Sequence, residues 1–378
     1  MAIPSIAMIP SGYKTNKVYS VLPTDGNGDL DFARTSTGTR VNSSGLIEEV
    51  GTGKPRLDYS DGSCPSLLLE PSSTNLITQS EAFDNAYWTK SGATVTSGFA
   101  SPSADTPLGA FKMVATANNA SVNRLISGLS NVMHSSSLYI KRVTGTGDVR
   151  LTQPDGNNLV VGVTSEWKRF DSSTLPSSGV DGYVGVNLAV LGDEVMIFGA
   201  QLEEGIATSL IPTAGTTVTR AADSASKSGI SSLINSSDGV LYAEISNSTS
   251  SGGDGYLSLS SDDGTGNNRV SIRFTAATNN LACQYVIGGV NQTSMDNILT
   301  DRTALNKIAF KYSLNDFSVW VNGVRLSTDA LGSVLPNGTL TKIVFNNGVA
   351  APLYGKCKDL RVYRTALTDA ELTILTTP

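Results

Sequence analysis

Residues 183–204, YVGVNLAVLGDEVMIFGAQLEE, contain the pattern on which the fold prediction depends. Within them, Val184-Gly185-Val186-Asn187-Leu188 alternates apolar with small or polar residues, and 194–204 forms a second apolar run after a glycine-containing turn. The same alternation occurs in Ser137-Leu138-Tyr139-Ile140-Lys141. A period of two is typical of strands that bury one face. These segments therefore predict β-sheet.

Strand-like segments of this kind recur at about 10–15 residues, with Gly, Asn and Pro turns between them, which favours sandwiches or jelly rolls over alternating βαβ units. We predict an all-β protein with one β-sandwich at 79–215 and a second at 216–378. An irregular, turn-rich segment precedes them at 1–78, and residues 213–226 form the hinge between the sandwiches.

Two local motifs place single elements in the second sandwich. Asn322-Gly323 lies between VWV and VRL, and this dipeptide is the preferred sequence of a type I′ hairpin turn. Thr368 and Glu371 stand at the spacing of a capping box, which predicts one short C-terminal helix over 368–375.

Composition excludes several classes of function. The net charge of −6 argues against a general nucleic-acid binder. A single histidine, His134, cannot build a histidine-based metal site within one chain. The three cysteines, Cys64, Cys283 and Cys357, are widely spaced and predict free thiols. No apolar run reaches 18 residues, so we expect no membrane span.

Residues 1–78 carry apolar side chains without a periodic pattern. The first ten residues are apolar and interrupted by prolines, which suits an extended anchoring peptide, because proline limits the entropy lost on ordering. Such a segment needs partner surface, so we expect its symmetry mates in a homo-oligomer, or another protein, to supply it. The predicted anchoring side chains are Ile3, Ile6, Ile9, Val18, Tyr19 and Val21.

The segment Asp31–Ile77 contains the R-x-S/T-x-x-T-R-V core from Arg34 to Val41, then GLIEEV, PRLDY, CPSLLLEP and TNL, with EAFDNAYW following at 81–88. It resembles the N-terminal region of bacteriophage fibre and spike proteins, including head spike fibres. Residues 199–223, GAQLEEGIATSLIPTAGTTVTRAAD, resemble the continuation of those proteins, in which a carbohydrate-binding-like jelly roll ends in a Q-L-E-x-G strand.

The last domain resembles laminin-G-like and concanavalin-like sandwiches through VWVNGVRL and DLRVYRTALTDAEL. Together the resemblances imply a virion surface protein that forms a homotrimer and is synthesised in the host cytoplasm. They also imply that its N-terminus contacts other capsid or tail proteins. They imply an anchoring segment at 1–78, a carbohydrate-binding-module-like sandwich at 79–215 and a laminin-G or concanavalin-like sandwich at 216–378.

Sugar sites on sandwiches use aromatic rings beside amide and carboxyl groups. Trp88, Trp167, Tyr87 and Tyr183 are the candidate residues of the middle domain. The alternative for each tryptophan is a place in the core. The alternation in EWKRF places Trp167 and Arg169 on one face of a strand.

Calcium would need several carboxylate and carbonyl oxygens supplied by loops. Asp254, Asp262 and Asp263 form the best candidate cluster, although no D-x-D-x-D-G spacing accompanies them. The alternative interpretation of these residues is a solvated turn without a metal ion. Apart from this candidate calcium, we expect no cofactor.

No catalytic residues are predicted, and we expect no enzyme activity. Glu48-Glu49 and Glu203-Glu204 are adjacent pairs whose members point to opposite faces of a strand, whereas glycoside hydrolysis needs two carboxylates on one cleft.

Two functions remain from the sequence. One is a bacteriophage surface fibre or spike, on head or tail, that presents its sandwiches to host-surface glycans. The alternative is a purely architectural capsid decoration, or tail or baseplate component, without a ligand.

Overall fold

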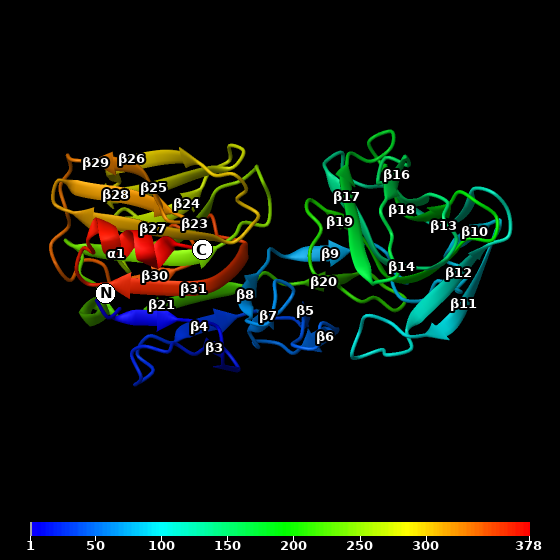
Figure 1. The fold of residues 1–378 in the computed structure, drawn as a ribbon, viewed down its shortest axis with the longest axis horizontal. Helices are drawn as coiled ribbons and strands as arrows, with labels where there is room; N and C mark the ends of the chain where they lie inside the picture. Colours follow the sequence, from blue (N-terminus) through cyan, green and yellow to red (C-terminus); the bar gives the residue numbers. More distant parts are fainter. Residues whose placement is uncertain (1) are drawn as a thin grey trace. The chain divides into compact units, whose positions relative to one another are not determined.

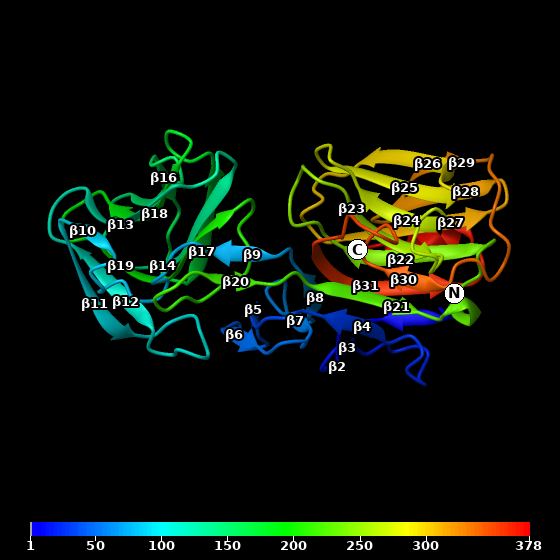
Figure 2. The same cartoon turned by 180° about the vertical axis from the view of Figure 1, so that it is seen from behind.

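A computed structural model describes residues 2–378, and Figures 1 and 2 show it from opposite sides. The chain is nearly all β, with one C-terminal α-helix, so the predicted fold class is confirmed. It divides into two compact units. Unit 1 comprises residues 2–35, 52–71 and 222–378, and unit 2 comprises 36–51 and 72–221.

Two sheets form unit 1 (Figure 2). The first has the order β29-β28-β27-β22-β31-β8-β7, with β1 also paired to β31. Its strands are β1 (Ile6–Met8), β7 (Arg56–Asp58), β8 (Ser66–Leu69), β22 (Gly239–Ile245), β27 (Asn306–Ser313), β28 (Asp316–Val321), β29 (Val324–Asp329) and β31 (Gly355–Tyr363).

The second sheet of unit 1 has the order β2-β3-β4-β21-β30-β23-β24-β25-β26. Its strands are β2 (Tyr13–Lys14), β3 (Lys17–Val18), β4 (Leu30–Ala33), β21 (Ser224–Ser228), β23 (Gly255–Ser260), β24 (Arg269–Phe274), β25 (Asn280–Ile287), β26 (Val290–Ile298) and β30 (Lys342–Val344). One hydrophobic core draws residues from both sheets, among them Leu241, Phe310 and Ile272. A short 3-10 turn, η1 (Ser231–Leu233), follows β21.

The helix α1 (Asp369–Thr376) lies over β27 and β28 (Figure 1). Its capping box between Thr368 and Glu371 is present as predicted. The helix buries Leu372 against a small cluster that includes Trp320, which is 5% exposed. The hairpin prediction is also confirmed, because Asn322 and Gly323 have φ of 48° and 85° between β28 and β29. Within residues 2–378 no helix is long and apolar enough to cross a membrane.

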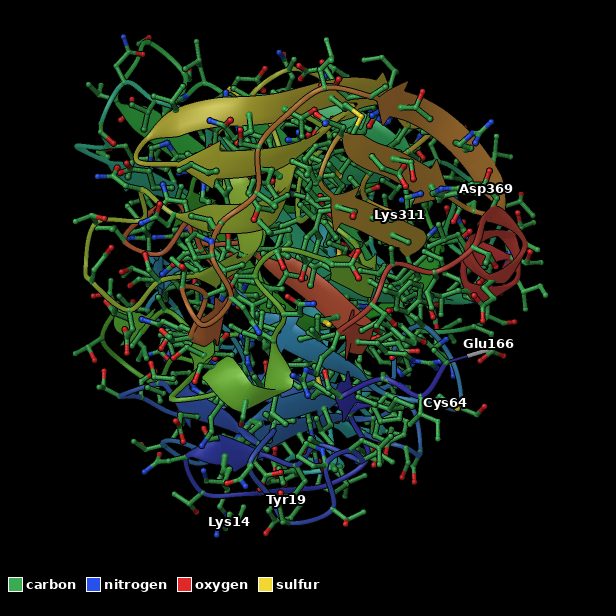
Figure 3. All side chains as sticks on the ribbon, turned by 90° about the vertical axis from the view of Figure 1, so that its left-hand side faces the viewer. Lys14, Tyr19, Cys64, Glu166, Lys311 and Asp369 are labelled. Carbon is green, nitrogen blue, oxygen red and sulfur yellow. The ribbon has the colours of Figure 1, made fainter. Side chains whose placement is uncertain are left out.

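The predicted anchoring residues divide into two groups. Ile6 and Val18 are fully buried in the core of unit 1, and β1 pairs with β31 through Ile6 opposite Val362. Four others keep exposed surface, at 82% for Ile3, 38% for Ile9, 39% for Tyr19 and 47% for Val21. Figure 3 shows Lys14 and Tyr19 near the β2–β3 hairpin at the outer side of unit 1.

The segment 1–78 is therefore no separate irregular module. Its strands belong to the sheets of both units. The prediction that this segment is irregular and has no core of its own is therefore wrong. Leu67, Leu69 and Val18 find partners in the core of unit 1, while Ile47 packs in unit 2. Apolar side chains that already have partners give no reason to expect a trimer, so the trimer stays a proposal.

A buried polar network joins the three chain segments of unit 1. The Arg56 guanidinium, which is 0% exposed, donates to Glu70 Oε2 at 2.5 Å and to Asp223 Oδ2. Arg34 donates to the other oxygen of Asp223 at 3.1 Å. Two positive and two negative groups thus compensate one another away from water, the condition under which buried charges are tolerated.

Unit 2 is a sandwich of two five-stranded sheets. The first has the order β10-β13-β18-β15-β16 and the second β11-β12-β19-β14-β17. Their strands are β10 (Thr89–Ser91), β11 (Ala93–Phe99), β12 (Ala110–Ala115), β13 (Ala120–Ser127), β14 (His134–Thr144), β15 (Val149–Thr152), β16 (Asn158–Val161), β17 (Lys168–Thr174), β18 (Asp181–Leu188) and β19 (Glu194–Glu204). Two small pairs, β5 (Gly38–Val41) with β6 (Ile47–Val50) and β9 (Ser73–Asn75) with β20 (Val218–Arg220), complete the unit.

Unit 2 has a buried polar cluster of its own. Asn75, which is 0% exposed, donates to the carbonyls of Ala200 and Ile211, and its oxygen accepts from the backbone of Ile77 and Leu202. Glu203 is equally buried and accepts from Ser73 at 2.7 Å and from the backbone N–H of Thr208 at 3.0 Å. Burial raises the pKa of Glu203, against the pull of Arg169 and these hydrogen bonds.

Candidate glycan-binding face

The first sheet of unit 2 has one face in the core and one polar face. Val122, Leu151 and Val186 are fully buried in the core. Because side chains alternate along a strand, their neighbours point to the opposite side. We call that opposite side the polar face. Its residues are Thr89, Ser91, Ser121, Asn123, Arg150, Thr152, Asn158, Val160, Tyr183, Gly185 and Asn187.

The strand register arranges these residues in two rows that run across the sheet. The first row consists of residues that are paired from strand to strand, in the order Ser91, Ser121, Asn187, Arg150 and Val160. The second row consists, in the same strand order, of Thr89, Asn123, Gly185, Thr152 and Asn158. Since neighbouring strands lie about 4.8 Å apart, each row extends over roughly 19 Å.

Hydrogen bonds within the polar face fix its amide groups. Asn187 Nδ2 donates to Asn158 Oδ1 at 2.6 Å and to Thr152 Oγ1 at 3.0 Å. Thr152 Oγ1 in turn donates to Asn123 Oδ1 at 2.8 Å. Within residues 2–378, Asn187 Oδ1 and the Nδ2 groups of Asn123 and Asn158 take part in no hydrogen bond. The face therefore offers one acceptor and two donor groups in fixed positions.

Glycine at position 185 allows this arrangement. A Cβ there would lie 2.1 Å from Asn123 Oδ1 and 2.3 Å from the backbone oxygen of Val122. The Asn123 side chain thus lies directly over the backbone of β18, where any larger residue would displace it.

Tyr183 is the one predicted aromatic candidate on the polar face. It stands opposite Leu125 in the β13–β18 register, and Leu125 is 40% exposed. The ring lies against Gly156, and a Cβ atom at that position would lie only 3.2 Å from the ring. The half-buried Tyr183 ring and the exposed Leu125 thus place apolar surface beside the amide groups.

Trp88 is not a platform for a ligand. The side chain is 2% exposed, stacks on Phe83 with centroids 4.7 Å apart, and donates from Nε1 to the Gln79 carbonyl at 3.0 Å. The prediction for Trp88 is corrected, because its ring fills the core and its polar atom is satisfied inside unit 2. Tyr87 is half-buried, and one face of its ring is covered by Arg124, 4.0 Å from the centroid.

Trp167 lies away from the polar face. It is half-buried and packs against the cluster of Ile47, Phe198 and Leu210 beside Tyr139. Trp167 directly precedes β17, and Arg169 Cζ lies 5.8 Å from the ring of Tyr139, which packs against the same cluster as Trp167. The structure does not bring Trp167 together with Tyr183.

The three aspartates of the calcium prediction are engaged by their own chain. Asp254 pairs with Arg273 at 2.7 Å, and Asp262 with Lys342 at 3.4 Å. Asp263 accepts from Thr265 and Ser261, and these hydrogen bonds lower its pKa. Among residues 2–378, no three His, Cys, Asp or Glu side chains are placed to hold a metal ion. Calcium at these residues stays a prediction from the sequence.

The adjacent glutamates point apart as predicted, because Glu203 is 0% exposed and Glu204 lies on the surface. Sequence reasoning missed another acidic group, Glu81. It lines a cavity of about 280 Å³ in unit 2 together with Glu49 and Asp105. Burial, and secondarily the charge of Asp105, raise the pKa of Glu81 to about 7.

The amides of the polar face were also missed. The sequence carries a signal for one of them, since the alternation in YVGVNL places Asn187 on the same side of the strand as Tyr183. Asn123, Thr152 and Asn158 join them only through the pairing of β13, β15 and β16, which the sequence does not specify.

No protein-family model matches the chain, and no curated protein matches it either. Among solved structures, the chain is similar to the CBM40 module of the Ruminococcus gnavus IT-sialidase, with a TM-score of 0.32, 19% identity, and coverage of 38% of this chain and 85% of that one. It is also similar to domain 4 of AbnA, a GH43 extracellular arabinanase from Geobacillus stearothermophilus in complex with arabinotriose. There the TM-score is 0.33, the identity 15%, and the coverage 46% of this chain and 83% of that one.

A third structure is the CBM22-1 xylan-binding domain of Xyn10C from Paenibacillus barcinonensis, with a TM-score of 0.27, 14% identity, and coverage of 36% of this chain and 94% of that one. Each similarity covers less than half of this chain.

Proposed function

We propose that unit 2 binds glycans on the polar face of its first sheet, and that the chain presents this face on the surface of a bacteriophage virion. The observation that carries the glycan proposal is the fixed set of amide groups at Asn123, Asn158 and Asn187 beside Tyr183. Sugars need donors and acceptors for their hydroxyls and an apolar surface for their C–H faces. The polar face offers both side by side.

Neutral sugars fit this face better than acidic ones. Arg150, its one cation, pairs with Asp148 at 3.4 Å and also donates to Asn119 at 3.3 Å. The chain as a whole carries a net charge of −6, which opposes the approach of polyanions. A row of roughly 19 Å has room for several sugar units, so the proposed ligand is a stretch of a linear neutral glycan.

The virion part of the proposal is supported by the resemblance of Asp31–Ile77 and 199–223 to phage fibre and spike proteins. An open face with one aromatic ring suits weak binding, of roughly millimolar affinity. Several copies on one particle, as in the proposed homotrimer, would raise the avidity by ~10²–10⁴ without a new contact. Adhesion to a host surface is a role in which weak, repeated binding suffices.

A glycan array with the full chain tests the glycan proposal. We expect neutral polysaccharides to bind, and the double variant Asn158→Ala, Asn187→Ala to lose that binding by at least ~10-fold. Asn291→Ala is the matched control, since Asn291 is an exposed asparagine on β26 of unit 1. Circular dichroism should show folded protein for both. Equal binding by the double variant would overturn the assignment of the face.

The virion proposal needs its own experiment. Antibodies against the chain, applied to purified particles of the phage that encodes it, should label head or tail in electron micrographs. Particles free of the chain would overturn the virion role and leave the glycan site untouched. Labelled particles together with a protein that binds no array glycan would favour the architectural alternative.

A further inference from the structure

Unit 1 contains a cavity that the proposed glycan face does not involve. Its volume is about 440 Å³, within the ~300–1,000 Å³ range of ligand pockets. It lies where the C-terminal end of β22 and the start of β31 meet the loop that precedes β27. The residues that line it include Asp61, Leu68, Ser246, Asn247, Leu305 and Lys356.

Two mostly buried polar side chains of this cavity each have one polar atom that makes no hydrogen bond within residues 2–378. Ser246 is 5% exposed and Asn247 is 9% exposed. Asn247 Oδ1 accepts from the backbone N–H of Thr249 at 3.1 Å, which fixes the amide. Within residues 2–378, neither Asn247 Nδ2 nor Ser246 Oγ makes a hydrogen bond. Both groups line the cavity and are therefore available to donate to, or accept from, a ligand hydroxyl group.

The charged wall of the cavity is locally neutralised. Lys356 Nζ donates to Ser60 at 2.6 Å and to Asp61 Oδ2 at 2.7 Å, and Asp58 lies 3.3 Å away. The ammonium thus has three oxygen neighbours, whereas the second oxygen of Asp61 is left as an acceptor. A free anion would meet the Asp61 carboxylate, and a metal ion would meet the Lys356 ammonium.

Arg302 holds the loops around the cavity in place. It is 0% exposed, and its guanidinium donates to the backbone carbonyls of Thr249 at 2.6 Å, Thr275 at 2.5 Å and Ala277 at 3.2 Å. The backbone N–H of Asn247 in turn donates to the Arg302 carbonyl at 2.8 Å. The donor groups of the cavity are therefore positioned before a ligand arrives, which reduces the entropy lost on binding.

We propose that this cavity is a second sugar site, which takes a single neutral, hydroxyl-rich ring. Asn247 Nδ2 and Ser246 Oγ bind its hydroxyl oxygens, and Asp61 accepts a hydroxyl proton. Leu68 and Leu305 provide the apolar wall for the C–H face of the ring. The site stands on residues of unit 1 alone and does not depend on the polar face of unit 2.

Ligand-observed NMR with the full chain tests this site, using glucose, galactose, N-acetylglucosamine and arabinose as probes at ~10 mM each. We expect at least one to bind. Asn247→Asp keeps the oxygen that accepts from Thr249 and removes the Nδ2 donor, and Ser246→Ala removes the hydroxyl. Each should weaken binding ~5- to 10-fold. Asn337→Asp is the matched control, because Asn337 Oδ1 accepts from a backbone N–H in an exposed turn.

The outcomes separate the two sites. Loss of monosaccharide binding in Asn247→Asp, with normal binding in the Asn158→Ala, Asn187→Ala protein, supports the cavity. No binding by any of the four probes overturns it. Binding that both cavity variants retain overturns it as well, and failure of the array experiment leaves this result unchanged.

Discussion

Glu81 gives unit 2 a stability that depends on pH. Its carboxyl group lines the cavity shared with Asp105, and its pKa is raised from 4.5 to about 7 by burial and then by the Asp105 charge. Between these values the folded chain holds a proton that the unfolded chain has released. The free energy of unfolding therefore falls as the pH rises from about 4.5 to 7. Below that window the contribution is constant.

The size of this effect follows from the shift. The difference between about 7 and 4.5 amounts to roughly 3.5 kcal/mol at ~1.4 kcal/mol for each pKa unit. Glu81 is only partly shielded from water, and solvent screening reduces the expected value to ~2 kcal/mol. Glu81→Gln replaces the carboxyl with a neutral group of the same shape. The variant should be only slightly more stable than the wild type at pH 5 and should exceed it by ~2 kcal/mol at pH 8.

Urea unfolding at pH 5, 6, 7 and 8 measures this difference. Tryptophan fluorescence is the signal, to which Trp88 and Trp167 of unit 2 contribute, and a Trp320→Phe background removes the contribution of unit 1. The matched control is Glu166→Gln, because Glu166 lies exposed on the surface (Figure 3). The control should follow the wild type at every pH. If the wild type and Glu81→Gln show the same pH dependence from 5 to 8, the carboxyl is ionised in the folded chain and the reasoning fails.

Three further changes test the packing. Trp88→Ala should destabilise unit 2 by ~3–5 kcal/mol in thermal or urea unfolding, as expected of a large core side chain. An unfolding midpoint close to that of the wild type would mean that the Trp88 side chain is not part of the core. Asp223→Asn leaves two buried arginines poorly compensated and should lower the stability of unit 1 by ~3–5 kcal/mol, whereas an effect below ~1 kcal/mol would mean that water enters the network. Deletion of residues 2–25 removes β1 and buried Val18, so the truncated chain should expose apolar surface and bind a hydrophobic dye; a cooperative transition at the wild-type temperature would show that these strands are dispensable.

The elements that the sequence predicted are those specified by neighbouring residues. Thr368 and Glu371 lie one helical turn apart, and Asn322-Gly323 is a complete turn signal in two residues. The place of the N-terminal strands was missed because their partners are distant. Ile6 pairs with Val362, and no local pattern in the first ten residues encodes that contact.

The candidate site shows the same division. Tyr183 was predicted as an aromatic candidate, and the alternation that follows it places Asn187 on the same side of the strand. Trp88 was misassigned, since an aromatic residue next to a turn looks alike in sequence whether it lies in the core or on the surface. Its burial arises from Phe83 and Phe111, which belong to different segments of unit 2.

The residues that carry the phage resemblance have a structural role that is now visible. Arg34, Arg56, Glu70 and Asp223 all come from the quoted motifs, and they meet in one buried network of unit 1. Each lies within about five residues of a point where the chain passes between units, at 35/36, 51/52, 71/72 and 221/222.

Each of the four places where the chain leaves or enters unit 1 thus has one residue of this buried network close to it in the sequence. The groups of the polar face lie outside those motifs, on β13, β15, β16 and β18. The residues that would contact the proposed ligand thus lie on other strands than the four residues of the buried network. It follows that a related chain could keep the four-residue network and bind a different sugar, and exchanging Asn123, Asn158 and Asn187 should alter specificity without altering the fold.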